Sequence, residues 1–172
     1  MTPAEPALLR GLGSVTGVVS RGLAVLAGVA LVAMMVFTAG DVLLRSLGRP
    51  VAGSFEVIGW LSASAMALAL GYVQLHRGHV AMTLVSSRLT GRAAALLDVV
   101  NGALALALFG LAAYHVVHYA GVLQDSGSLS ETLKVIVYPW VYVLGLGFAG
   151  LTLALLADLA QSLHRLLRGT AA

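Results

Sequence analysis

Four apolar segments, each as long as a membrane-crossing helix, constrain this chain more than any other feature. They cover residues 23–44, 56–75, 93–119 and 138–163, and a helix needs about 20 predominantly apolar residues to cross a bilayer. Hydrophobic residues make up 59% of the sequence and charged residues 10%, which is more apolar surface than a water-soluble globule of this size can bury. We therefore predict an all-α integral membrane protein with four transmembrane helices in a single domain, residues 1–172.

Three shorter segments, residues 5–20, 80–92 and 129–137, are expected to be interfacial helices that lie on the membrane surface. In the first two, apolar residues recur at helical spacing opposite small or polar residues. The third follows the tetrapeptide SLSE at residues 128–131, whose spacing is that of a capping box, so we predict a helix from Leu129. Pro139 lacks a backbone donor and is expected to kink that helix where it enters the fourth span.

The positions of the basic residues predict the orientation. Placing both termini and the loop after the second span on one side collects these arginines there: Arg10, Arg21, Arg77, Arg88, Arg92, Arg165 and Arg168. The other side keeps Arg45, Arg49 and Lys134. By the positive-inside rule both termini are therefore cytoplasmic. Trp60 and Trp140 fall near the predicted outer ends of their spans, as expected for an aromatic belt at the interface.

An unusual concentration of charge surrounds the Gly-Pro turn between the first two spans, in GDVLLRSLGRPVAGSFEVIG. Asp41 and Arg45 are four residues apart and can pair on one helix face. The short turn is expected to bring Glu56 back beside Arg45 or Arg49. Such a turn can anchor the helix ends or present a recognition surface outside the membrane, and both interpretations stay open.

Four of the five histidines form two pairs that the predicted topology separates. His76 and His79 lie at the inner end of the second span, and His115 and His118 lie near the outer end of the third. A bis-histidine haem needs imidazoles from different helices at similar depth, which this arrangement does not provide. No carboxylate or thiol stands at helical spacing to complete a metal site with His115 and His118, and the sequence contains no cysteine. We expect no metal and no cofactor.

Two carboxylates fall inside predicted spans, where ionisable residues are candidates for function. Asp98 and Asp158 both lie close to the cytoplasmic interface, near Arg92 and Arg165, rather than at the midplane where a transported ion would be held. Structural pairing is the favoured interpretation. The sequence shows no Ser/His/Asp constellation, phosphate-binding loop or catalytic carboxylate pair, so we predict a subunit that is not an enzyme.

Small residues recur every fourth position in two of the spans. Ala63, Ala67 and Gly71 form one ladder in the second span, and Gly150 and Ala154 belong to another in the fourth. Such ladders allow helices to approach closely. The pattern is compatible with packing inside the bundle and with packing against a partner.

Three stretches resemble the small membrane subunit of TRAP transporters, the tripartite ATP-independent periplasmic carriers (DctQ-type). DVLLRSLGRPVAGSFEVIG is similar to the family's Arg, Pro and Glu between spans one and two. GYVQLHRGHVAMTLVSSRL is similar to its Arg-x-His element after span two, and ETLKVIVYPWVYVLGLG to its Pro-Trp entry to span four. The resemblance covers most of the chain from the first span onward, and the order and spacing of the three stretches make it specific.

The resemblance implies a subunit of the bacterial inner (cytoplasmic) membrane that scaffolds a large multi-span transport subunit. It also implies that the chain helps dock a periplasmic solute-binding protein, for sodium-driven uptake of an organic acid or similar solute. Arg45 and Glu56 occupy family-like positions on the periplasmic side, and Arg49 joins these expected docking residues by its location. Residues expected to support structure or assembly are Asp41, His79, Asp98, Asp158, Pro139 and Trp140. Membrane lipid is a further expected partner, and nucleic acid is not. The alternative is a membrane-anchor subunit of a respiratory oxidoreductase.

Overall fold

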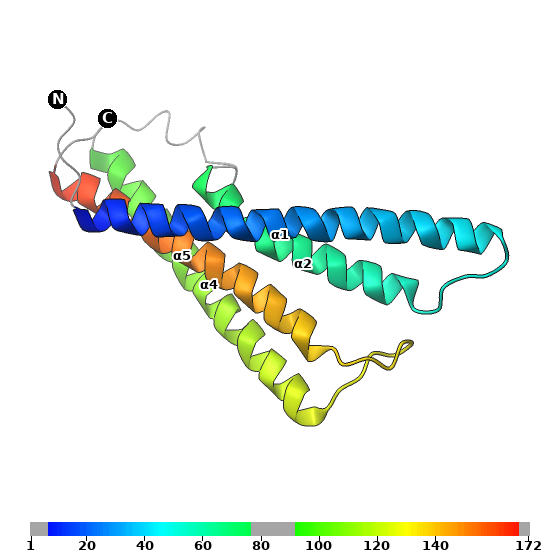
Figure 1. Ribbon diagram of the computed structural model, residues 1–172. Helices are drawn as coiled ribbons and strands as arrows, with labels where there is room; N and C mark the ends of the chain where they lie inside the picture. Colours follow the sequence, from blue (N-terminus) through cyan, green and yellow to red (C-terminus); the bar gives the residue numbers. More distant parts are fainter. Residues whose placement is uncertain (1–6, 77–91, 169–172) are drawn as a thin grey trace.

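The computed structural model describes residues 7–76 and 92–168, and this part of the chain is mostly helical (Figure 1). The helices described are α1 (Ala7–Ser46), α2 (Ser54–Leu75), α4 (Arg92–Ser126) and α5 (Tyr138–Arg168). Each of them is long and apolar enough to cross a membrane. The prediction of an all-α membrane protein with four spans is confirmed. The interfacial segment expected at residues 80–92 lies outside the described residues, apart from Arg92 at the start of α4.

Helix α1 is much longer than the first predicted span. Its 40 residues correspond to about 60 Å at 1.5 Å per residue, about twice the thickness of the hydrocarbon core. The separate interfacial helix expected at residues 5–20 is wrong from residue 7 onward, because these residues are the first turns of α1. Thr16 and Ser20 are completely buried in the bundle, whereas Val15 and Val18 are exposed. The small side chains let α1 pack closely on its neighbours, and the two valines point away from the bundle.

The helix expected at residues 129–137 is also wrong, because its expected capping residue, Ser128, instead closes the end of the preceding helix. Ser128 donates its backbone N–H to the carbonyl oxygen of Leu123 at 3.2 Å, one turn back in α4. Gly127 has a φ of 61°, so these residues end α4 in the left-handed conformation typical of a helix C-terminus. Pro139 lies in the first turn of α5, where a helix does not need the missing N–H. It therefore starts α5 instead of kinking a longer helix.

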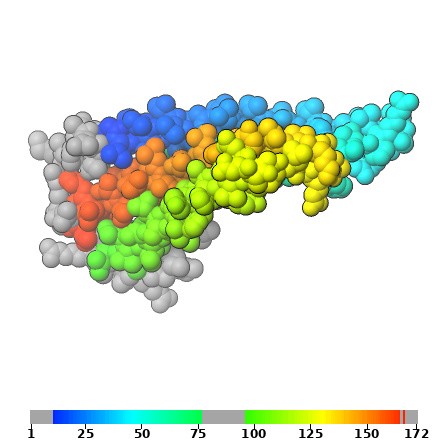
Figure 2. Space-filling view, turned by 90° about the horizontal axis from the view of Figure 1, so that it is seen from below, coloured from blue at the N-terminus to red at the C-terminus, as the bar shows by residue number. Residues whose placement is uncertain are grey.

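Helix α5 is the centre of the bundle. It packs against α2 and α4 and more briefly against α1, and Figure 2 shows it between α1 and α4. A Cβ atom added at Gly147 would overlap the backbone of Ala67, and one added at Gly71 would lie 3.1 Å from the carbonyl of Gly150. The small-residue ladders of α2 and α5 therefore pack against each other inside the bundle.

The two helix pairs, α1 with α2 and α4 with α5, diverge toward one end of the molecule (Figure 1). We call this the loop end, because it carries the α1–α2 turn (residues 47–53) and the α4–α5 connection (residues 127–137). The α1–α2 turn projects beyond the α4–α5 connection in Figures 1 and 2. The start of α1 and the end of α5 lie together at the opposite end.

Candidate functional site

The α1–α2 turn is fixed from inside by one carboxylate. Asp41 is only 7% exposed, and its Oδ2 accepts a hydrogen bond from Nη2 of Arg45 at 2.9 Å. Its Oδ1 accepts the backbone N–H of Val51 at 3.2 Å, on the far side of the turn. Arg45 also reaches the hydroxyl of Ser54 at 3.5 Å, and its guanidinium lies 5.9 Å from the centre of the Phe55 ring. The predicted Asp41–Arg45 pair is confirmed, and it connects the end of α1 to the start of α2.

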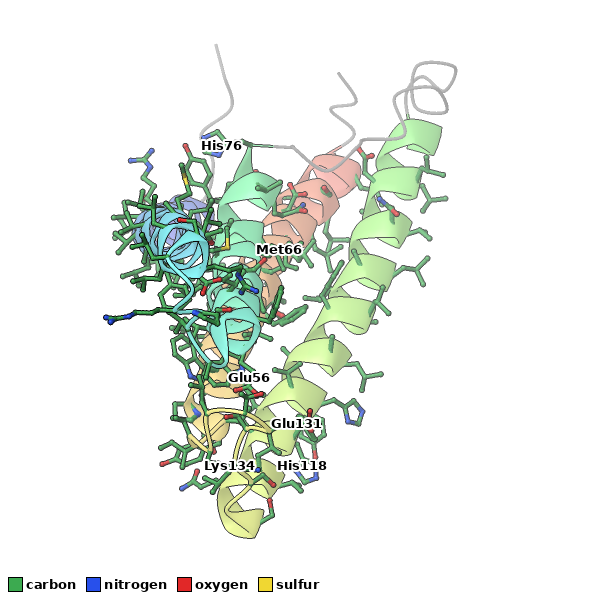
Figure 3. The ribbon with its side chains drawn as sticks, turned by 90° about the vertical axis from the view of Figure 1, so that its right-hand side faces the viewer. Glu56, Met66, His76, His118, Glu131 and Lys134 are labelled. Carbon is green, nitrogen blue, oxygen red and sulfur yellow. The ribbon has the colours of Figure 1, made fainter. Side chains whose placement is uncertain are left out.

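Glu56 binds a different part of the chain from the one expected. Its Oε1 accepts the backbone N–H of Thr132 at 2.7 Å, and its Oε2 accepts that of Leu133 at 3.2 Å. Glu56 was predicted to lie beside Arg45 or Arg49, but it forms no salt bridge with either of them; the salt bridge found within the described ranges is Asp41–Arg45. Figure 3 shows Glu56 beside the α4–α5 connection. Glu56 therefore joins the first turn of α2 to a loop 76 residues away in the sequence.

The loop that Glu56 holds has a defined shape. The backbone N–H of Ser130 donates to the carbonyl of Val135 at 2.8 Å, and the N–H of Val135 donates to the Ser130 hydroxyl at 3.3 Å. Leu129 and Ile136 form an isolated antiparallel bridge just outside this pair. Lys134 has a φ of 54°, a left-handed conformation that a residue with a Cβ adopts at a cost. The result is a closed hairpin-like loop whose tip is bound to α2.

Side-chain packing reinforces the hydrogen bonds to Glu56. Gly53, at the N-cap of α2, has a φ of 74°, and a Cβ atom there would overlap the side chain of Leu133. Trp60 of α2 stacks on Trp140 of α5 with ring centres 5.5 Å apart. The contact between Gly53 and Leu133 could not be predicted, because neither residue type signals a long-range partner. Trp140 was expected to support the assembly, and the structure places it in this contact between two spans.

Arg49 differs from the other expected docking residues in that no side-chain hydrogen bond or salt bridge is found for it among the described residues. Its side chain is exposed, and it takes part in no salt bridge among the described residues. It follows Gly48, whose φ of 74° ends α1, and its own N–H donates to the carbonyl of Leu44 at 2.9 Å. The backbone at Arg49 is thus fixed while its guanidinium faces outward.

The remaining predicted residues lie away from this cluster. Asp158 is exposed near the opposite end of α5, and Nε2 of Gln74 lies 3.4 Å from its Oδ2. Asp98 is exposed in α4. Pairing of these carboxylates with Arg165 and Arg92 stays a prediction, and His79 lies outside the described residues.

The other histidines occupy the two ends of the bundle. His76 and His118 lie at opposite ends (Figure 3), and the ring of His118 stacks on Tyr114 at 6.1 Å. Within residues 7–76 and 92–168 no three His, Cys, Asp or Glu side chains gather closely enough to hold a metal ion.

Comparison with known proteins adds one match. A profile of the family described as "Tripartite ATP-independent periplasmic transporters, DctQ component" matches residues 34–165. This region contains every loop-end residue discussed above, from Asp41 to Trp140. No curated protein and no solved structure matched the chain. The match gives no support to a membrane anchor of a respiratory oxidoreductase.

Proposed function

The chain belongs to the family of DctQ components of tripartite ATP-independent periplasmic transporters, and from this premise we propose that it is the stationary scaffold of such a transporter. It is a small multi-pass subunit of a multi-subunit transporter in the inner membrane. In our proposal the large multi-span subunit carries the solute and ion sites and moves during transport. This chain widens the fixed part of the complex and helps receive a periplasmic solute-binding protein. The cargo is an organic acid or similar solute, and sodium drives its uptake.

The observation that carries the scaffold proposal is the close crossing of α2 and α5. Gly147 lies so close to the Ala67 backbone that it leaves no space for a Cβ atom, and Gly71 faces Gly150 in a similar way. Backbones in such contact cannot slide past one another without separating. The contact therefore supports a rigid body against which a partner can move.

The orientation is part of the proposal. We place the loop end in the periplasm, because the helix ends that carry Arg10, Arg92 and Arg165 lie at the opposite end of the bundle (Figure 1). The stacked Trp60 and Trp140 would then lie at the outer interface, where amphipathic aromatic rings are favoured. The exposed Arg49 would face the periplasmic partner.

The docking role can be tested by charge reversal at Arg49. We expect Arg49→Glu to slow uptake of the solute carried by the binding protein, and Arg49→Gln to have a smaller effect. The amount of the membrane complex should stay unchanged, because the Arg49 side chain contacts no other described residue through a salt bridge. Wild-type uptake by Arg49→Glu would contradict a docking role for this residue.

Orientation has a separate test, since the natural chain lacks cysteine. A cysteine introduced at Arg49 should react with a membrane-impermeant maleimide added to spheroplasts. A cysteine introduced at the exposed His76 should react only after the membrane is opened. The reverse pattern would overturn the proposed orientation.

A further inference from the structure

Packing is uneven along the length of the bundle. The buried residues of α2, apart from Ser54, lie within residues 64–71. The described buried residues of α1, apart from Asp41, lie within residues 16–27. Both ranges belong to the half of the bundle that is farther from the loop end. A region with few buried contacts opens locally at a lower free energy, so the half next to the loop end is the weaker one.

The separation of α2 and α5 changes in the same direction. Where the backbones cross, a Cβ atom added at Gly147 would overlap the backbone of Ala67. Nearer the loop end the two helices meet through Trp60 and Trp140, whose ring centres are 5.5 Å apart. Large side chains thus fill a gap that small residues close further in, where the helix pairs have not yet diverged (Figure 1). The close crossing is therefore the natural pivot between the two pairs.

Glu56 joins the two helix pairs farther from this pivot than the tryptophans do. Along α2, Glu56 lies about 16 Å from Ala67 and Trp60 lies about 10 Å from it, at 1.5 Å per residue. The carboxylate of Glu56 accepts the amides of Thr132 and Leu133, and hydrogen bonds to a charged acceptor are stronger than those between neutral groups. The contact therefore acts on the longer lever arm.

The loop on the other side of this contact can transmit a restraint to α5. Ser130 and Val135 are joined by two hydrogen bonds, so the loop is closed on itself. It leads directly into Tyr138, the first residue of α5. A flexible loop would absorb any movement of α5, whereas a closed loop couples the start of α5 to Glu56.

The helix dipole alone does not account for Glu56. An acidic residue in the first turn of a helix is favoured by the dipole even when it faces solvent. The carboxylate of Glu56 instead binds two successive amides, 76 and 77 residues away in the sequence. Figure 3 shows it beside the α4–α5 connection. Its contacts therefore cross the opening between the helix pairs.

We propose that Glu56 is a positioning residue, a carboxylate clasp that sets the angle between the pair α1–α2 and the pair α4–α5 at the loop end. Loss of the clasp lets the pairs part about the crossing of α2 and α5, while the inner half stays packed. This conformational role goes beyond the proposed function, because it belongs to the chain itself. It also differs from the docking role expected for Glu56, whose two carboxylate oxygens are engaged inside the chain.

Distances between pairs of spin labels, measured by double electron–electron resonance, test the clasp directly, since the natural chain lacks cysteine. Leu47→Cys and Asp125→Cys, at exposed positions, place one label on each helix pair at the loop end. His76→Cys and Leu163→Cys, also at exposed positions, report the opposite end. In the full chain in lipid nanodiscs, Glu56→Ala should add a longer component to the loop-end distances and leave the distances at the opposite end unchanged.

Three further variants sharpen the distance measurement. Glu131→Ala is the matched control, because it removes an exposed carboxylate from the same loop and should give wild-type distances. Glu56→Gln keeps one acceptor oxygen and should give an intermediate distribution, and it carries the test if Glu56→Ala does not yield monodisperse protein. Opening by Trp60→Ala without opening by Glu56→Ala would assign the angle to the stacked tryptophans and overturn the proposal.

Amide hydrogen exchange shows whether the clasp itself is released. Exchange at Thr132 and Leu133 should be at least about ten-fold faster in Glu56→Ala than in the wild type, given the strength of hydrogen bonds to charged acceptors. Faster exchange with unchanged loop-end distances would show that the released loop does not set the angle. Broader distances at both ends would show a general loss of packing. Either result would overturn the proposal.

The outcome is separate from that of the proposed function. The distance and exchange measurements use the purified full chain, so they give a result whether or not a large transport subunit accompanies it. Failure to find such a subunit in the native membrane would contradict the proposed function and leave the clasp standing. Unchanged loop-end distances would remove the clasp and leave the proposed function standing.

Discussion

Replacing Gly147 by alanine tests whether α2 and α5 are locked together through their backbones. The added methyl group would overlap the carbonyl carbon and oxygen of Ala67, and it would lie 2.8 Å from the backbone nitrogen of Leu68. These atoms are part of the α2 backbone, so they cannot rotate away as the end of a flexible side chain could. The helices must separate to admit the methyl group, and nearby contacts must loosen with them.

The expected size of the effect follows from two opposed terms. Overpacking of a well-packed core costs about 1–3 kcal/mol, and replacement of a helical glycine by alanine gains up to about 1 kcal/mol. We expect Gly147→Ala to lower the free energy of unfolding by about 1–2 kcal/mol. Gly59→Ala, also within a helix, meets no atom within 4 Å and should stabilise the protein slightly.

A third substitution shows whether the obstacle is backbone or side chain. A Cβ atom at Gly145 would meet a γ-methyl group of Val117 at 2.8 Å, and Val117→Ala removes that group. Val117→Ala should therefore relieve much of the damage caused by Gly145→Ala, whereas truncation of Ala67 to glycine should not rescue Gly147→Ala.

The assay is thermal unfolding of the purified variants in the same mild detergent. Unfolding is monitored as the loss of monodisperse protein with rising temperature. Among the three glycine substitutions, Gly147→Ala should be the most damaging and Gly59→Ala should be neutral or stabilising. Equal stability of the Gly147→Ala and Gly59→Ala variants would refute the close crossing, and with it the observation that supports a rigid scaffold.

Three further perturbations address the loop end. Gly53→Ala should destabilise the protein both through its left-handed backbone and through overlap with Leu133. Leu133→Ala should relieve the overlap alone, and full rescue of thermal stability would show that the backbone term is negligible. Asp41→Ala should lower the melting temperature more than Asp41→Asn, because asparagine keeps an oxygen that can accept the Val51 N–H. Equal melting temperatures of the two variants would show that only the charge of Asp41 matters. A double-mutant cycle on Trp60 and Trp140 should give a coupling of about 1 kcal/mol, and additive effects would contradict their stacking.

The spans and the ion pair in α1 could be predicted from the sequence because both depend on local patterns. Long apolar runs need lipid and form helices there, and residues four apart on a helix meet whatever the rest of the chain does. Asp41 and Arg45 accordingly pair as expected.

The role of Glu56 could not be predicted, because its partners are backbone amides. Every residue except proline carries such an amide, so Thr132 and Leu133 offer no signal in the sequence. Their approach depends on how α2 and α5 pack, which the charged residues alone do not specify. Sequence proximity and opposite charge instead favour Arg45 and Arg49 as neighbours of Glu56.

The two wrong helix predictions have a common physical origin. The helical spacing at the start of α1 and the capping-box spacing at residues 128–131 are local patterns, and neither carries information about neighbouring helices. In the structure, Thr16 and Ser20 are buried by neighbouring helices, and Ser128 completes the end of α4 through Leu123. Tertiary packing and the end of a preceding helix outweighed the local patterns.

The central claim is that this chain is the fixed membrane subunit of a tripartite transporter. The most direct test is affinity purification of the chain from its native membrane in mild detergent, with mass spectrometry of the proteins that accompany it. The account predicts a large multi-span transport protein in equal amount, retained by the Arg49→Glu variant as by the natural chain. Recovery of the chain alone, or with a haem- or flavin-bearing partner, would contradict it.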